Sequence, residues 1–154
     1  MSSSPDLLEL KKRYLAVNFI GLTMIASIFV YAAVVEVLKR TLAPFPGFAS
    51  LDAAQLQILK YLFAALAFGH FIIIKVIRKF LASRGVAFLP QAAIITFALC
   101  ESVGVMGLIL FLLQGNPLDF YVFMLLSLFY FWLYFPKFRD WEAQLESQKS
   151  PVGP

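Results

Sequence analysis

Residues 97–113 read FALCESVGVMGLILFLL and hold one carboxylate, that of Glu101, in an otherwise apolar run. A helix needs about 20 mostly apolar residues to cross the hydrocarbon core of a bilayer, which is about 30 Å thick. This run and its flanking residues provide them. A charged side chain near the bilayer centre costs at least about 2.5 kcal/mol, so a carboxylate at that depth is by default a functional candidate. The stretch therefore predicts a transmembrane helix with a candidate site at Glu101.

The composition of the whole chain agrees with a membrane protein. The 154 residues are 61% hydrophobic and 14% charged, with a mean hydropathy of +0.82. Soluble domains are only about 45–50% apolar. The length accommodates about four spanning helices with short connections and leaves no room for a separate soluble domain. We therefore expect an all-α integral membrane bundle of four transmembrane helices, in a multi-pass protein of the cell inner (plasma) membrane.

Glycine and proline clusters divide the apolar sequence into segments, because these residues end helices. The transmembrane helices are expected at about residues 14–38, 58–80, 91–114 and 118–135. Ser50, Leu51 and Asp52 offer an N-cap ahead of the second helix. Residues 1–136 would then form the transmembrane domain, and 137–154 a polar cytoplasmic tail.

The basic residues predict the orientation of the chain. Ten of the 13 Lys and Arg residues fall at the helix ends that share a side with the N-terminus, and three fall opposite, namely Lys39, Arg40 and Lys60. Lys and Arg are kept on the cytoplasmic side of inner-membrane proteins. The chain is therefore expected to have both termini inside. No basic run indicates a nucleic-acid partner, and the partner that the composition does predict is the lipid bilayer.

Glu101 and His70, the only histidine of the chain, are predicted at one depth. Each lies about ten residues from the inner end of its helix, which is about 15 Å at 1.5 Å per residue. The second and third helices are antiparallel neighbours, so the two side chains can meet across a shared seam. We expect them to form a proton- or ion-binding site. The alternatives are a neutral hydrogen bond that only fixes helix register, a ligand site, or no contact.

Small residues near Glu101 predict close helix packing. Cys100, Gly104 and Gly107 form a stripe on the third helix, and Gly69 is a small residue of the second helix. Such stripes let helix backbones approach closely, either inside one bundle or between copies of the chain. Ordinary packing within one bundle is the favoured interpretation.

The side chains that could act as nucleophiles, acids, bases or metal ligands are too few for most catalytic sites. Cys100 is the single cysteine, so one chain can build neither a disulfide nor a thiolate metal site. One histidine with one glutamate is also short of the three protein ligands that a catalytic zinc usually keeps. We therefore expect no metal, no cofactor and no catalytic activity of the chain's own.

Two further predictions concern the ends of the helices. Glu36 lies one turn before Lys39 and Arg40, a spacing that predicts an interfacial salt bridge. The aromatic fourth helix and the tail contribute Trp132 and Trp141, which are expected to anchor the chain at the membrane interface.

The sequence around Glu101 resembles the carboxylate-bearing helix of the proteolipid (c) subunit of rotary ATP synthases. The shared pattern has small residues on both sides of the carboxylate, Gly107-Leu108 within a long aliphatic run, and Asn116-Pro117 where the helix leaves the membrane. The resemblance implies that Glu101 takes up and releases a proton. It covers the third helix only, since the family's other helix carries regularly spaced glycines where this chain has Gly69 alone. Otherwise the chain has the features of a small bacterial four-helix membrane protein.

Two functions follow as hypotheses. The first is proton or cation handling at Glu101 with His70, alone or within a larger complex. The second is a structural or assembly subunit whose small-residue stripes and aromatic helix bind partner membrane proteins or further copies of the chain.

Overall fold

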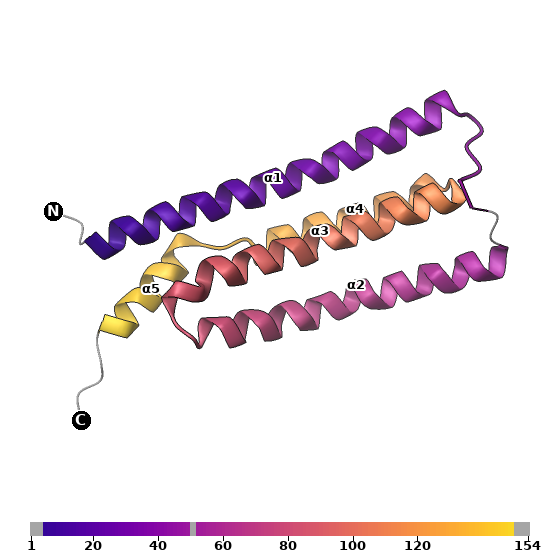
Figure 1. Ribbon diagram of the computed structural model, residues 1–154. Coiled ribbons are helices and arrows are strands. Elements are labelled where there is room, and N and C mark those ends of the chain that lie inside the picture. Colours follow the sequence, from indigo (N-terminus) through magenta and orange to yellow (C-terminus); the bar gives the residue numbers. More distant parts are fainter. Residues whose placement is uncertain (1–4, 50–51, 150–154) are drawn as a thin grey trace.

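The computed structural model describes residues 5–49 and 52–149, and these residues form helices and no strand (Figure 1). The elements are α1 (Pro5–Thr41), α2 (Ala53–Ala82), the 3₁₀ turn η1 (Val86–Phe88), α3 (Leu89–Gln114), α4 (Pro117–Tyr134) and α5 (Phe138–Lys149). Four segments of this part of the chain are long and apolar enough to cross a membrane, and they contain α1, α2, α3 and α4. The prediction of an all-helical chain with four such segments is confirmed.

Helices α3 and α4 form the centre of the bundle, with α1 and α2 on either side (Figure 1). Helix α3 contacts each of the other three long helices, and its buried residues therefore lie on several of its faces. Phe97, Val103 and Leu110 of α3 are fully buried, as are Phe120 and Ser127 of α4. A helix surrounded in this way is apolar all round and shows no single hydrophobic stripe.

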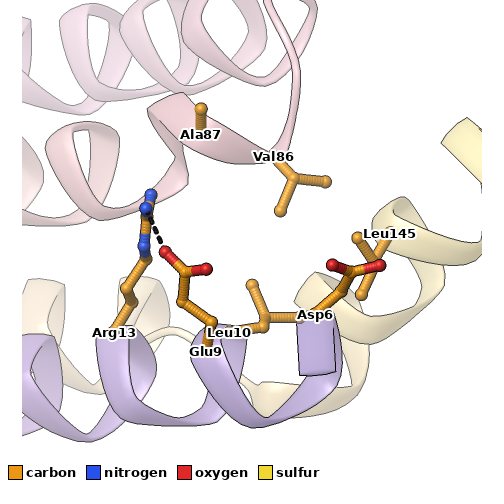
Figure 2. Close-up of a pocket in the computed structure, with 7 residues that line it drawn as sticks. All are labelled: Asp6, Glu9, Leu10, Arg13, Val86, Ala87 and Leu145. Atoms are coloured by element: carbon orange, nitrogen blue, oxygen red, sulfur yellow. Dashed lines mark hydrogen bonds and ion pairs between the residues drawn. The ribbon is translucent and has the colours of Figure 1, made fainter. Parts of the chain in front are cut away.

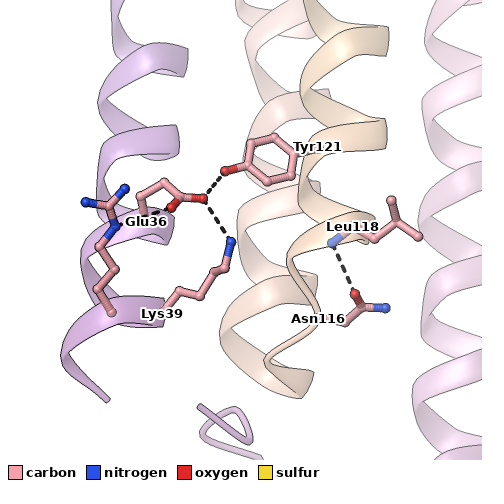
Figure 3. Close-up of polar contacts among 6 residues, drawn as sticks. Glu36, Lys39, Asn116, Leu118 and Tyr121 are labelled. Carbon is pink, nitrogen blue, oxygen red and sulfur yellow. Dashed lines mark hydrogen bonds and ion pairs between the residues drawn. The ribbon is translucent and has the colours of Figure 1, made fainter. Parts of the chain in front are cut away.

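The bounds of α3 and α4 agree with the prediction to within two residues, whereas α1 begins at Pro5 and α2 at Ala53, earlier than the predicted residues 14 and 58. Asp52 caps α2: its side chain accepts from the Gln55 N–H at 2.8 Å, and the Gln55 side chain accepts from the Asp52 N–H at 3.2 Å. Ser50 and Leu51, part of the same predicted cap, lie outside the described residues. Gly115 ends α3 with φ of 72°, a left-handed conformation that favours glycine. Asn116 then caps α4 by accepting from the Leu118 N–H at 3.1 Å (Figure 3).

The C-terminal tail packs back onto the bundle through α5. Trp141 is only 5% exposed, and its ring meets that of Tyr14 edge to face at a centroid distance of 5.5 Å. The Tyr14 hydroxyl also donates to the Pro136 carbonyl at 3.1 Å. Trp141 is therefore a core residue, which corrects its prediction as an interfacial anchor, because the N-terminal turns of α1 supply an apolar surface for it. Trp132 is 77% exposed, as a lipid-facing ring would be.

Helix α5, η1 and the start of α1 enclose a small pocket of about 190 Å³ (Figure 2). Leu10, Val86 and Leu145 supply its apolar wall. Arg13 and Glu9 form an ion pair at its edge, with 2.6 Å between the guanidinium nitrogen and the carboxylate oxygen. Both partners are well exposed, and ion pairs of that kind contribute little to stability.

Candidate functional site

Glu101 lies in the middle of α3 and faces α1. Its Oε1 accepts two hydrogen bonds, from the Ser27 hydroxyl at 2.5 Å and from the Tyr31 hydroxyl at 2.8 Å. Ser27 and Tyr31 are four residues apart on α1, so they lie on one face of that helix. All three side chains are half-buried. Within the described residues, no hydrogen bond or ion pair reaches the second oxygen, Oε2. The site is thus a carboxyl group held on one oxygen by two hydroxyls.

This arrangement suits both protonation states of Glu101. The Ser27 oxygen also lies 2.7 Å from the Met24 carbonyl, and a hydroxyl has one proton to donate. When Glu101 is ionised, Ser27 and Tyr31 can both donate to the carboxylate. When Glu101 is protonated, the carboxyl can donate to Ser27, whose own proton then turns to the Met24 carbonyl. The hydrogen bonds of both forms of Glu101 can therefore be satisfied with no displacement of the surrounding heavy atoms.

His70 occupies a second polar position, between α2 and α3. The ring is 9% exposed, and its Nδ1 lies 2.6 Å from the Leu66 carbonyl, so Nδ1 carries a proton. Its Nε2 lies 3.1 Å from the Ser102 hydroxyl oxygen, which is also 2.8 Å from the Leu99 carbonyl. In the neutral ring, Nε2 accepts from Ser102. In the charged ring it donates, and Ser102 donates to Leu99.

The structure places His70 and Glu101 at the same level but not in contact. His70 bonds to Ser102, the residue next to Glu101, while Glu101 bonds to α1. Neighbouring residues of an α-helix point about 100° apart, so Glu101 and Ser102 face different helices. No hydrogen bond or ion pair joins the two among the described residues. The expected His70–Glu101 pair is therefore replaced by two separate sites on different faces of α3.

Sequence analysis did not identify the partners of Glu101. Ser27 and Tyr31 stand at helical spacing in an apolar segment, and that pattern is the signal that would have indicated a polar face on α1. The short connection between the second and third helices makes them neighbours, and this is why His70 is the predicted partner of Glu101.

Three of the four predicted packing residues lie at the contact between α3 and α4. Cys100 is fully buried, and its carbonyl accepts from the Ser127 hydroxyl at 2.6 Å. A Cβ at Gly104 would lie 3.4 Å from the Ser127 oxygen, and one at Gly107 would lie 2.6 Å from the Phe123 Cβ. The stripe thus packs helices within one chain. It occupies this contact rather than offering a surface to another copy.

The structure does not place Gly69 in this packing. No heavy atom lies within 4 Å of the position that its Cβ would take. Helix α2 packs against the bundle through a different face from that of Gly69, and Ala67 and His70 are buried there. A close approach of α1 to α3 occurs at Gly21, which was not predicted. A Cβ there would lie 2.7 Å from the Phe97 ring.

Glu36 ties the C-terminal turns of α1 to α4 (Figure 3). Its Oε1 accepts from the Tyr121 hydroxyl at 2.5 Å and from Lys39 at 3.2 Å, and Arg40 lies 3.7 Å from Oε2. The predicted salt bridge is confirmed, and Tyr121 is an additional partner from α4.

Asp119, at the start of α4, is a buried carboxylate that sequence analysis did not single out. It is 4% exposed. Its Oδ2 accepts from the Gln114 amide at 2.5 Å and from the Asn116 amide at 3.3 Å, and the Lys60 ammonium of α2 contacts Oδ1. An isolated Lys near the start of the second segment and an Asp in the first turn of the fourth were the available signals. These helices run parallel, so the two residues lie at the same end of the bundle.

The described residues contain no group of three or more His, Cys, Asp or Glu side chains that could hold a metal ion. Comparison of the chain with protein-family models, curated proteins and solved structures finds no match. The function is therefore inferred from the site geometry and from the sequence around Glu101.

Proposed function

We propose that this chain is a multi-pass membrane protein in which Glu101 binds and releases a proton, or a small cation, inside the bilayer. The observation that carries the proposal is the pair of hydroxyls on Oε1, at 2.5 Å from Ser27 and 2.8 Å from Tyr31. Hydrogen bonds to a charged acceptor are worth about 1.5–3 kcal/mol, which makes an ionised carboxylate tolerable at this depth. The alternative acceptor for Ser27, the Met24 carbonyl, keeps the protonated form satisfied as well.

The resemblance of the third helix to rotary ATP synthase proteolipids points to the same role for Glu101. His70 is a second proton-binding group in this proposal, with its own hydroxyl partner in Ser102. Ser102 lies on a different face of α3 from Glu101, so the two groups act separately rather than as a hydrogen-bonded pair.

Covalent labelling with a hydrophobic carbodiimide tests the proposal. The reagent modifies protonated carboxyl groups, so Glu101 should be labelled in membranes at low pH, and labelling should fall as the pH rises. Peptide mass spectrometry identifies the modified residue and separates it from Glu36 and Asp119. Sodium ions that protect Glu101 would indicate a cation site, whereas unchanged labelling would indicate protons. Absence of labelling at every pH would contradict the proposal.

The same experiment distinguishes the hydroxyl partners from His70. Removal of both hydroxyls, by Ser27→Ala with Tyr31→Phe, takes away both hydrogen bonds to the charged carboxylate, so labelling of Glu101 at neutral pH should rise about tenfold. His70→Phe should leave the labelling of Glu101 within about twofold of the unmodified chain, because His70 contacts Ser102 instead. A rise in labelling in His70→Phe as large as that in the double variant would contradict this assignment.

A structural role is the second candidate. The exposed aromatic residues of α4, Phe129 at 49% and Trp132 at 77%, favour it, since they offer a surface for partner membrane proteins. In that case Glu101 would only join α1 to α3. Native co-purification in mild detergent tests this role. A chain that binds no partner protein there, and forms no cross-link to one in membranes, counts against it.

We further propose that both termini face the cytoplasm and that the membrane is the inner (plasma) membrane. Ten of the 13 basic residues support this orientation. Ser147→Cys in α5 should react with an impermeant maleimide only after cells are permeabilised, whereas Leu42→Cys should react in intact cells. Cys100 is fully buried and serves as the unreactive background. The reverse pattern would contradict the orientation.

A further inference from the structure

A polar cavity of about 310 Å³ lies between the first turns of α2 and α4. Lys60 and Asp119 line it together with Gln57, Tyr61 and Asn116. Asp119 is almost fully buried and already accepts from Gln114, Asn116 and Lys60, whereas the Lys60 side chain remains 45% exposed. The cation of this pair is therefore the partner that can reach a further ligand.

An apolar groove of about 460 Å³ follows along the same two helices. Its walls are Ala64 and Phe68 of α2 with Val122, Leu125, Leu126 and Phe129 of α4. Ala64 follows Lys60 by one turn and Val122 follows Asp119 by about one turn, so the groove continues the polar cavity along the helix axis. We call the cavity and the groove together the α2–α4 seam.

The dimensions of the α2–α4 seam match one leaflet of a bilayer. Helix α2 has 30 residues and is about 45 Å long, so about 8 Å projects at each end beyond a hydrocarbon core of about 30 Å. Lys60 lies about 10 Å from the start of α2, at the boundary between headgroups and hydrocarbon. Phe68 lies about 22 Å from that start, at the bilayer centre. The α2–α4 seam, from Lys60 to Phe68, therefore extends over about 12 Å, close to the depth of one leaflet of the hydrocarbon core.

We propose that the α2–α4 seam binds one glycerophospholipid from the leaflet around the N-terminal end of α2. Its phosphate pairs with the Lys60 ammonium, and the hydroxyl of Tyr61 and the amide of Gln57 line the headgroup cavity. One acyl chain fills the groove beside Ala64 and Phe68. The site is independent of Glu101, which faces α1 on another side of α3.

Native mass spectrometry of the full chain in mild detergent, titrated with palmitoyl-oleoyl phosphatidylglycerol, tests this binding. One lipid should remain bound per chain, and inorganic phosphate or oleate added alone should not displace it. Lys60→Met should lower the bound fraction about tenfold, because it removes the charge-assisted contact to phosphate. Ala64→Phe should lower it similarly by filling the groove while the Lys60–Asp119 pair stays intact.

Lys75→Met is the matched control, since it makes the same charge change near the other end of α2, where Lys75 lies over the Phe71 ring. It should retain lipid as the unmodified chain does. Retention that is unchanged in either seam variant, or that falls equally in Lys75→Met, would overturn the proposal. Displacement by inorganic phosphate would also overturn it, because the acyl chain would then contribute nothing.

Discussion

Glu101→Gln is expected to abolish proton flux through the protein in liposomes. Glutamine has nearly the same shape and keeps a carbonyl oxygen that can accept from Ser27 and Tyr31, so the contact between α1 and α3 should survive. It cannot gain or lose a proton near neutral pH. The expected flux is therefore that of protein-free liposomes, measured with an entrapped pH-sensitive dye under an imposed membrane potential.

Glu36→Gln is the matched control for this experiment. Glu36 is also a carboxylate of the bundle that accepts from a tyrosine hydroxyl, that of Tyr121, but it lies in the last turns of α1 beside Lys39. Its neutralisation should leave flux within about twofold of the unmodified protein, since surface ion pairs contribute little. Flux at the unmodified level in Glu101→Gln liposomes would contradict the proposed role of Glu101. An equal loss in both variants would indicate a general loss of structure.

The bounds of α3 and α4 were predicted to within two residues, because these helix ends depend on local chemistry. Gly115 ends α3 in a left-handed conformation, and Asn116 caps the next helix through its own side chain. Neither effect needs a tertiary contact. The common level of Glu101 and His70 along the bundle was predictable because the rise per residue is constant along a helix.

The partner of Glu101 was not predictable, because rotation about the helix axis depends on which helices pack on which faces. The prediction has Glu101 facing the neighbouring helix of the hairpin, and hence His70. In the structure, α3 contacts both α1 and α2, and one step along α3 separates Glu101 from the residue that meets His70. An error of about 100° in rotation exchanges one partner for the other, even when the level along the bundle is correct.

Gly107→Ala is expected to destabilise the contact between α3 and α4. The added Cβ would lie 2.6 Å from the Phe123 Cβ and 3.1 Å from the Phe120 carbonyl oxygen, both of which belong to α4. Backbone atoms cannot turn aside as a flexible side chain can, so α3 and α4 must separate. Overpacking of this kind costs about 1–3 kcal/mol. We expect a net loss of about 2 kcal/mol in the free energy of unfolding, measured by SDS titration in mixed micelles with circular dichroism.

Gly69→Ala makes the same chemical change where the structure leaves open space around the new methyl group. Alanine is favoured over glycine inside a helix by about 1 kcal/mol, so this variant should be as stable as the unmodified chain or more so. Opposite signs for the two variants would show that Gly107 is required for close approach, because helix propensity alone changes both in the same direction. Equal stabilisation of both would mean that α3 and α4 do not approach at Gly107, and equal loss would place Gly69 in a contact as well.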